Sequence, residues 1–206
     1  MSCTSLQGSL AWCEGKTVLP GIRKRLYYTS KQNIAAWPTL PTDTNGRPTS
    51  STYTGSFTMK MTGDKSAIWN VIDVIVSKSG LTSEAQGEYP SQTQLNKLTA
   101  VHPGVDEAAS MAAAYLNNND CVFLIEDMPG KYRVLGSDKW QGTVTVAQDL
   151  GQGATGTAST TINAEATDLI PAPFYNGEIV LDEDRDNVIN EAVNETSESS
   201  DEDEND

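Results

Sequence analysis

His102 is the only histidine in the chain, so any Ser-His-Asp or Cys-His mechanism would have to use it. It precedes Pro103, between a predicted strand and a predicted helix. Polar side chains are common at such corners, which lie at the protein surface. We therefore expect His102 to be a structural residue and not a general base.

The loop 151–156, with the sequence GQGATG, matches the G-x-G-x-x-G pattern of dinucleotide-binding proteins. In those proteins a helix begins inside the motif, and its N-terminus holds the phosphates. The sequence that follows, TGTASTTIN, is rich in threonine and predicts a strand instead. We expect these glycines at the tip of a β-hairpin and expect no nucleotide cofactor.

Two adjacent carboxylates, Glu126 and Asp127, could in principle share acid-base work. Neighbouring residues of a strand point to opposite faces, however, and aspartate is a frequent turn residue. The cysteines, Cys3, Cys13 and Cys121, are odd in number and match neither a zinc site nor a disulfide framework. We expect free thiols, with Cys121 a small buried apolar residue, and neither a metal nor enzymatic activity.

A short basic stretch combines cations with aromatic rings, as a nucleic-acid-binding face does: Arg23, Lys24, Arg25, Tyr27, Tyr28 and Lys31. A chain with a net charge of −14 lacks the broad basic surface that phosphate binding requires. We favour pairing of this stretch with acidic groups of a neighbouring subunit, and a solvated strand edge is the alternative. The predicted subunit-interface residues are Arg23, Lys24, Arg25, Tyr27, Glu88 and Tyr89.

Charge divides the chain into unequal parts. Residues 182–206 contain twelve acidic residues and one arginine, so this segment carries −11 of the net charge of −14 and only about −3 remains for residues 1–181. Few apolar side chains and strong self-repulsion predict a disordered acidic tail. We expect an N-terminal arm at 1–20 and a β-rich domain at 21–181. With neither a membrane span nor a secretion signal in view, we expect assembly in a cytoplasm and no membrane insertion.

The elements that would position these residues centre on a hairpin at 121–136, CVFLIEDMPGKYRVLG. Its first arm is apolar on both faces, which predicts a strand covered on two sides. Pro129 and Gly130 predict a type II turn between the arms, with Pro129 at the second position. Further strands are predicted at 22–29, 53–61, 68–76, 93–100, 143–147, 157–164 and 174–181.

Two long polar segments, 37–52 and 81–92, are predicted as loops, and long loops are often functional or interfacial. One helix is predicted at 105–117, where apolar residues follow a helical spacing. The pattern is mainly β (α+β): an antiparallel sandwich or small barrel with one flanking helix.

Several short segments, in their order along the chain from Trp69, support a resemblance: IDVIV, LTSEAQGEYPS, the segment from His102 through Ser137, GQGATG and PAPFYNGEIV. Over about 65–181 the chain resembles the tail-tube or tail-ring proteins of bacteriophages that infect Bacteroidetes-type hosts, the crAss-like group among them. The N-terminal 64 residues and the acidic tail depart from this pattern.

The resemblance implies a structural virion protein, found in the tail or connector, with a tail-tube type of β-fold. Copies would form a homo-oligomeric ring, contact neighbouring tail or connector proteins, and let double-stranded DNA pass through the lumen during genome ejection. Ring closure would pair edge strands that are a liability in a monomer. A capsid decoration or adaptor protein is the alternative, and an enzyme or ligand-binding domain would depend on His102 or the 151–156 loop.

Overall fold

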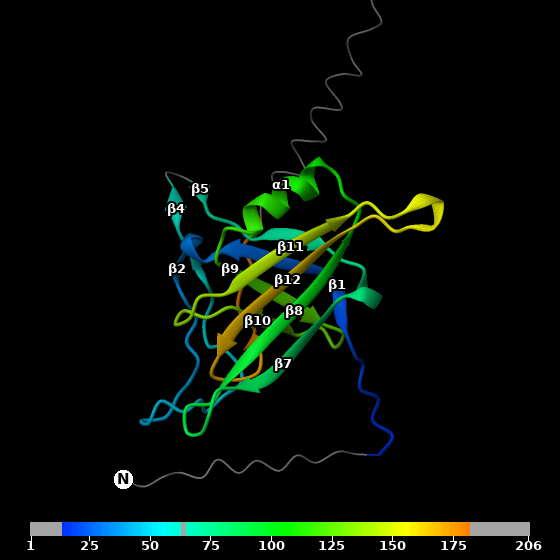
Figure 1. Cartoon of the computed structure of the whole chain (residues 1–206). Coiled ribbons are helices and arrows are strands. Elements are labelled where there is room, and N and C mark those ends of the chain that lie inside the picture. Colours follow the sequence, from blue (N-terminus) through cyan, green and yellow to red (C-terminus); the bar gives the residue numbers. More distant parts are fainter. Residues whose placement is uncertain (1–13, 63–64, 182–206) are drawn as a thin grey trace, which may run out of the picture.

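The computed structural model describes residues 14–62 and 65–181. Two antiparallel sheets form the body, with one helix beside them (Figure 1). The five-stranded sheet has the order β13 (Phe174–Tyr175), β10 (Tyr132–Leu135), β9 (Cys121–Asp127), β1 (Ile22–Ser30) and β6 (Asn70–Asp73). The four-stranded sheet has the order β11 (Thr143–Asp149), β12 (Ser159–Asp168), β8 (Thr93–Pro103) and β7 (Gly80–Gln86).

The two sheets share one apolar interior. Alternate residues of each strand point into it, because successive side chains of a strand face opposite sides of the sheet. Its buried members come from both sheets, the helix and the residue after β6: Ile22, Leu26, Tyr28, Ile72, Val74, Leu98, Ala100, Leu116, Cys121, Phe123, Ile125, Leu135, Val144, Ile162, Ala164 and Ala166. The predicted mainly β sandwich with one helix is confirmed, and the described strands form open sheets and no closed barrel.

The opposite face of the five-stranded sheet is also covered. A segment between β1 and β6 lies over it and includes two small sheets, β2 (Ile34–Ala36) with β3 (Thr58–Met59) and β4 (Met61–Thr62) with β5 (Lys65–Ser66). A second buried apolar cluster joins them: Ile34, Tyr53, Phe57, Met59, Trp69, Val122, Leu124, Val134 and Tyr175. This cover explains why β9 is apolar on both faces, as predicted for a strand buried on two sides.

The β9–β10 turn is present, but it is shifted by one residue from the prediction. The Gly130 amide donates to the Asp127 carbonyl at 2.9 Å, so Met128 and Pro129 are the central residues of the turn. Gly130 follows them with φ +92°, a conformation that glycine adopts without steric cost. The side chain of Asp127 accepts from the Lys131 amide at 2.7 Å and so fixes the return of the chain.

The helix α1 (Glu107–Leu116) lies within the predicted 105–117. Asp106 caps it, because its Oδ1 accepts from the Ala109 amide at 2.7 Å. Asn117 Oδ1 accepts from the Val146 amide at 2.7 Å, which ties the end of the helix to β11. The helix therefore covers part of the outer edge of β11, one of the ways in which proteins protect an edge strand.

Replacing Asp106 by alanine should lower the free energy of unfolding by about 1 kcal/mol, because the helix loses its N-terminal hydrogen bond. Urea denaturation measures this change. Asp106→Asn is the matched control, since an asparagine Oδ1 still accepts from Ala109 and should retain most of the stability. Equal losses in both variants would contradict a capping role.

Four element predictions are corrected. The strand predicted at 68–76 is only β6, and a 3₁₀ turn, η2 (Val76–Lys78), follows it. The segment 81–92 is not a loop throughout: Gly80–Gln86 forms β7, whose polar composition concealed it, and only 87–92 is a turn. Of the strand predicted at 174–181 only the first two residues pair as β13, and of 53–61 only short pieces pair.

The predicted arm and tail lie mostly outside the described residues. Residues 1–13 and 182–206 are not described, so the acidic tail stays a prediction. The part of the arm that is described, 14–20, contains no strand and is exposed.

Candidate functional site

The predicted basic interface on β1 is partly neutralised within the chain itself. Arg23 Nη1 lies 2.9 Å from Glu126 Oε1, and Arg25 Nε lies 3.2 Å from Asp73 Oδ1. Both partners belong to strands next to β1 in the sheet, β9 and β6. Lys24 lies between the two arginines and is exposed, and it forms no ion pair with the residues that the structure describes.

Tyr27, the aromatic member of the predicted interface on β1, is partly buried. It contacts the second apolar cluster, and its ring lies 6.0 Å from that of Tyr132. On β1, therefore, Lys24 and the half-exposed arginines Arg23 and Arg25 are the basic side chains that another molecule could contact.

Glu88 and Tyr89 lie at the tip of the β7–β8 hairpin. Glu88 O accepts from the Ser91 amide at 2.8 Å and closes the turn. The Tyr89 ring projects into solvent, with 90% of its surface exposed. Such a large aromatic ring at a hairpin tip is typical of a contact with another protein.

The structure does not bring the two groups of predicted interface residues together. Arg25 is paired with Asp73, whose carbonyl lies beside His102 near the end of β8. Glu88 and Tyr89 precede the beginning of the same strand, and its length separates the groups by roughly 30 Å at 3.3 Å per residue. If both take part in assembly, they serve different contacts.

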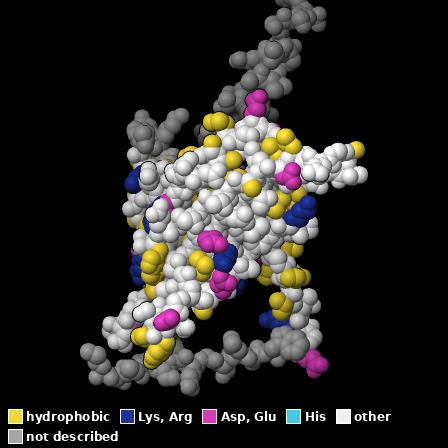
Figure 2. Space-filling model, viewed as in Figure 1, with side chains coloured by type: hydrophobic (Ala, Val, Ile, Leu, Met, Phe, Trp, Pro, Cys, Tyr) yellow, Lys and Arg dark blue, Asp and Glu magenta, His cyan; other side chains and the backbone are white. Residues whose placement is uncertain are grey.

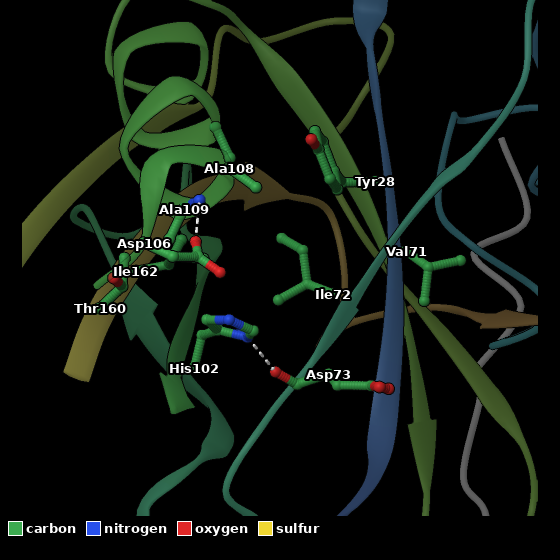
Figure 3. A pocket seen from close by; sticks show the side chains of 11 residues that line it. Tyr28, Val71, Ile72, Asp73, His102, Asp106, Ala108, Ala109, Thr160 and Ile162 are labelled. Carbon is green, nitrogen blue, oxygen red and sulfur yellow. Dashed lines mark hydrogen bonds between the residues drawn. The ribbon is translucent and has the colours of Figure 1, made fainter. Parts of the chain in front are cut away.

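His102 lines a cavity of about 320 Å³ between α1, β6, β8 and β12 (Figure 3). Much of its wall is apolar, from the alanines of the helix and from Ile72 and Ile162. His102 Nδ1 lies 2.7 Å from the Asp73 carbonyl oxygen, so this nitrogen carries the proton and donates it. Figure 3 shows this hydrogen bond between the imidazole and Asp73.

The other polar groups of this cavity also serve the fold. Thr160 Oγ1 donates to Gly104 O at 2.9 Å, Asp106 caps the helix, and Asp73 accepts from Arg25. This geometry fits the predicted corner role of His102 and pairs it with no nucleophile among the described residues. The absence of enzymatic activity stays a prediction.

The glycine-rich loop 151–156 joins β11 to β12, as predicted for a hairpin tip, and projects from the body (Figure 1). Its single 3₁₀ turn, η3 (Gly153–Thr155), is too short to hold phosphates at a helix N-terminus. A Cβ on Gly151 would lie 2.9 Å from the Thr157 amide nitrogen, so the glycine permits a close crossing of the backbone. Leu150 precedes this tip and is 77% exposed.

The remaining chemical candidates have structural partners. Glu126 pairs with Arg23, and Asp127 serves the hairpin turn, as predicted. Cys121 is buried and free, and its burial raises the pKa of the thiol to about 11, so it acts as a small apolar residue. Cys3 and Cys13 lie outside the described residues.

One buried acid was missed from the sequence. Asp168, the last residue of β12, is only 5% exposed, and burial raises the pKa of its carboxyl to about 6. An acidic residue at the end of a Thr- and Ala-rich strand normally indicates solvent, so the sequence gives no signal of this burial.

None of the helices within 14–62 and 65–181 combines the length and the hydropathy needed to cross a membrane. Comparison with known proteins gives no further assignment: no protein-family model matches this chain, and no match was found among curated proteins or solved structures.

Proposed function

We propose that this chain is a non-enzymatic structural protein of a bacteriophage virion. It assembles into a ring or tube of the tail or of the head-to-tail connector and forms a conduit for genome ejection. The observation that supports this most directly is the free edge of the four-stranded sheet at β7, which continues into the exposed Tyr89 tip.

The two edges of this sheet differ. The outer edge of β11 receives the helix through Asn117 and Val146. Strand β7 has no backbone hydrogen bond outside its own sheet among the described residues, and most of its side chains are exposed. The seven residues of β7 pair with β8 on one side, and the backbone groups on the other side form a template for another chain. Pairing of such an edge with a different surface of the next copy is heterologous, and heterologous contacts close into rings or extend as filaments.

The outer face of the four-stranded sheet suits a surface along which DNA slides. It presents threonine and asparagine side chains, such as the hydrogen-bonded Thr99 and Asn163. Its lysine, Lys97, is neutralised by Glu84 and Glu165. Figure 2 shows few charged side chains on this side of the molecule, of both signs. Such a face would not retain phosphates, because retention requires clustered lysine and arginine.

Light scattering and negative-stain images of the purified chain, over a range of protein and salt concentrations, test this proposal. Closed rings or stacked tubes are the expected result. A monomer at every concentration would contradict self-assembly and favour the alternative of a capsid decoration or adaptor protein, which waits for a virion lattice.

Tyr89→Ala should weaken self-association by about tenfold or more, because an exposed aromatic at the tip of the free edge is a typical hot spot. Concentration-dependent light scattering measures this, and the melting temperature should stay unchanged at concentrations where both proteins are monomeric. Leu150→Ala is the matched control, since this exposed apolar residue lies at the tip beside the covered edge of β11. Equal effects of both variants would contradict assembly through β7.

A further inference from the structure

A second cavity, of about 260 Å³, lies between the segment 37–42 and the residues that follow β10 and β12. Side chains with an oxygen atom or an aromatic ring make up much of its lining: Trp37, Thr39, Tyr53, Ser137, Asp138 and Asp168. Neither histidine nor cysteine lines it. Carboxylate and hydroxyl oxygens, without imidazole or thiolate, suit a hard cation and not a soft metal.

Asp168, which lines this cavity, carries an uncompensated acceptor. Its Oδ1 accepts from the Leu169 amide at 2.6 Å. Its Oδ2 is buried and has no hydrogen-bond partner among the described residues. A buried carboxylate oxygen without a partner is costly, since the charge has lost its hydration without replacement.

The neighbours of Asp168 make this cost larger. The negative charge of Asp138 acts on Asp168 and, together with Asp168, raises the pKa of the buried Tyr53 hydroxyl further than burial alone does. Lys139, at the rim of the same cavity, opposes them but forms no ion pair there within the described part of the chain. Two carboxylates therefore line this cavity against the single ammonium of Lys139, and Asp168 Oδ2 has no hydrogen-bond partner among the described residues.

We propose that this cavity binds a calcium ion, with Asp168 as the buried ligand and Asp138 as the second carboxylate. Calcium accepts six to eight oxygen ligands in flexible geometry, including carboxylates, carbonyl groups and water, whereas magnesium demands a near-octahedral set. The Tyr53 and Ser137 hydroxyl groups and water complete the ligand set. This inference does not rest on the proposed role in a virion.

Terbium luminescence tests the site in the full chain. Tb³⁺ replaces Ca²⁺ at oxygen sites and emits when a nearby Trp or Tyr is excited. Trp37 and Tyr53 both line the cavity, whereas residues 182–206 contain no aromatic residue, so binding of terbium to the acidic tail is not sensitised directly. We expect saturable sensitised emission that Ca²⁺ displaces, and a melting temperature that rises with Ca²⁺.

Asp168→Asn should weaken terbium binding by at least tenfold and abolish the rise in melting temperature with Ca²⁺. Asp138→Asn, at an exposed position, should weaken binding in the same direction. Asp149→Asn, an exposed aspartate at the β11–β12 tip, is the matched control and should bind like the wild type. Wild-type binding in both cavity variants, or emission that Ca²⁺ does not displace, would overturn the proposal. So would a Ca²⁺-insensitive melting temperature in a wild-type chain, which would leave Lys139 as the counterion.

Discussion

Replacing Trp69 by alanine is expected to lower the free energy of unfolding by about 3–5 kcal/mol. Trp69 is 2% exposed and lies in the second apolar cluster, where its ring meets Phe57 at 5.3 Å in an edge-on arrangement. Its removal leaves a cavity between the covering segment and the five-stranded sheet, which the small sheets around it cannot fill. Urea denaturation followed by far-UV circular dichroism measures the loss.

Tyr89→Ala is the control for Trp69→Ala, because it also removes an aromatic ring but from an exposed position. Its effect on the free energy of unfolding should stay within about 0.5 kcal/mol. A loss below about 1 kcal/mol for Trp69→Ala would mean that residues 34–69 do not pack as a stable layer. The assignment of the second core, and with it the two-sided burial of β9, would then be wrong.

The sequence predicted the burial of β9 on two faces, but not what covers its outer face. An apolar run such as Cys121–Ile125 indicates only that water is excluded from both faces of the strand. The cover comes from residues 34–69. In its first part Pro38, Pro41 and Pro48 interrupt any period of two or of 3.6, so no periodic pattern indicates that Trp37 packs there. The alternation over 53–61 includes the buried Phe57, but Phe57 packs against Trp37 from irregular backbone and not from the long strand that the alternation predicts.

The same limit applies to β7. Its sequence, GLTSEAQ, has little β propensity, and it is a strand because it pairs with β8 from Gly80 opposite Thr99 to Gln86 opposite Thr93. Leu81 is its only large apolar residue directed at the core. Such an edge strand forms because the neighbouring strand pairs with it, and its β propensity alone predicts a loop.

The candidate cation site could not be predicted at all, for a related reason. Asp138 and Asp168 are thirty residues apart. Asp138 follows β10 and Asp168 ends β12, and only the packing of residues 37–42 over both makes a cavity. His102, by contrast, was placed correctly at a strand-to-helix corner, because Pro103 and the helical spacing after it are local signals.

Asp168→Asn should stabilise the protein at neutral pH in the presence of a chelator. Burial, the largest cause, and the charge of Asp138 raise the pKa of Asp168 to about 6, against the opposing effects of the Leu169 amide and Lys139. Because the folded carboxyl holds its proton to a higher pH than the unfolded one does, its contribution is fully present below about pH 4 and is lost as pH rises to about 6. The loss amounts to about 3 kcal/mol, at 1.36 kcal/mol per pKa unit.

Urea denaturation of both proteins from pH 5 to 7.5 measures this effect while avoiding the pI near 4.3, where solubility is lowest. Over that range the stability of the wild type should fall relative to Asp168→Asn by about 1–1.5 kcal/mol, because half of the total loss occurs below pH 5. Taking the difference between the two proteins cancels the titration of the other carboxylates. Asp138→Asn should reduce the fall only partly, since the charge it removes is a smaller cause than burial. Parallel pH profiles for wild type and Asp168→Asn would show that the Asp168 carboxyl is solvated in the folded protein. The burial of Asp168 Oδ2 would then be wrong, and the proposed cation site depends on it.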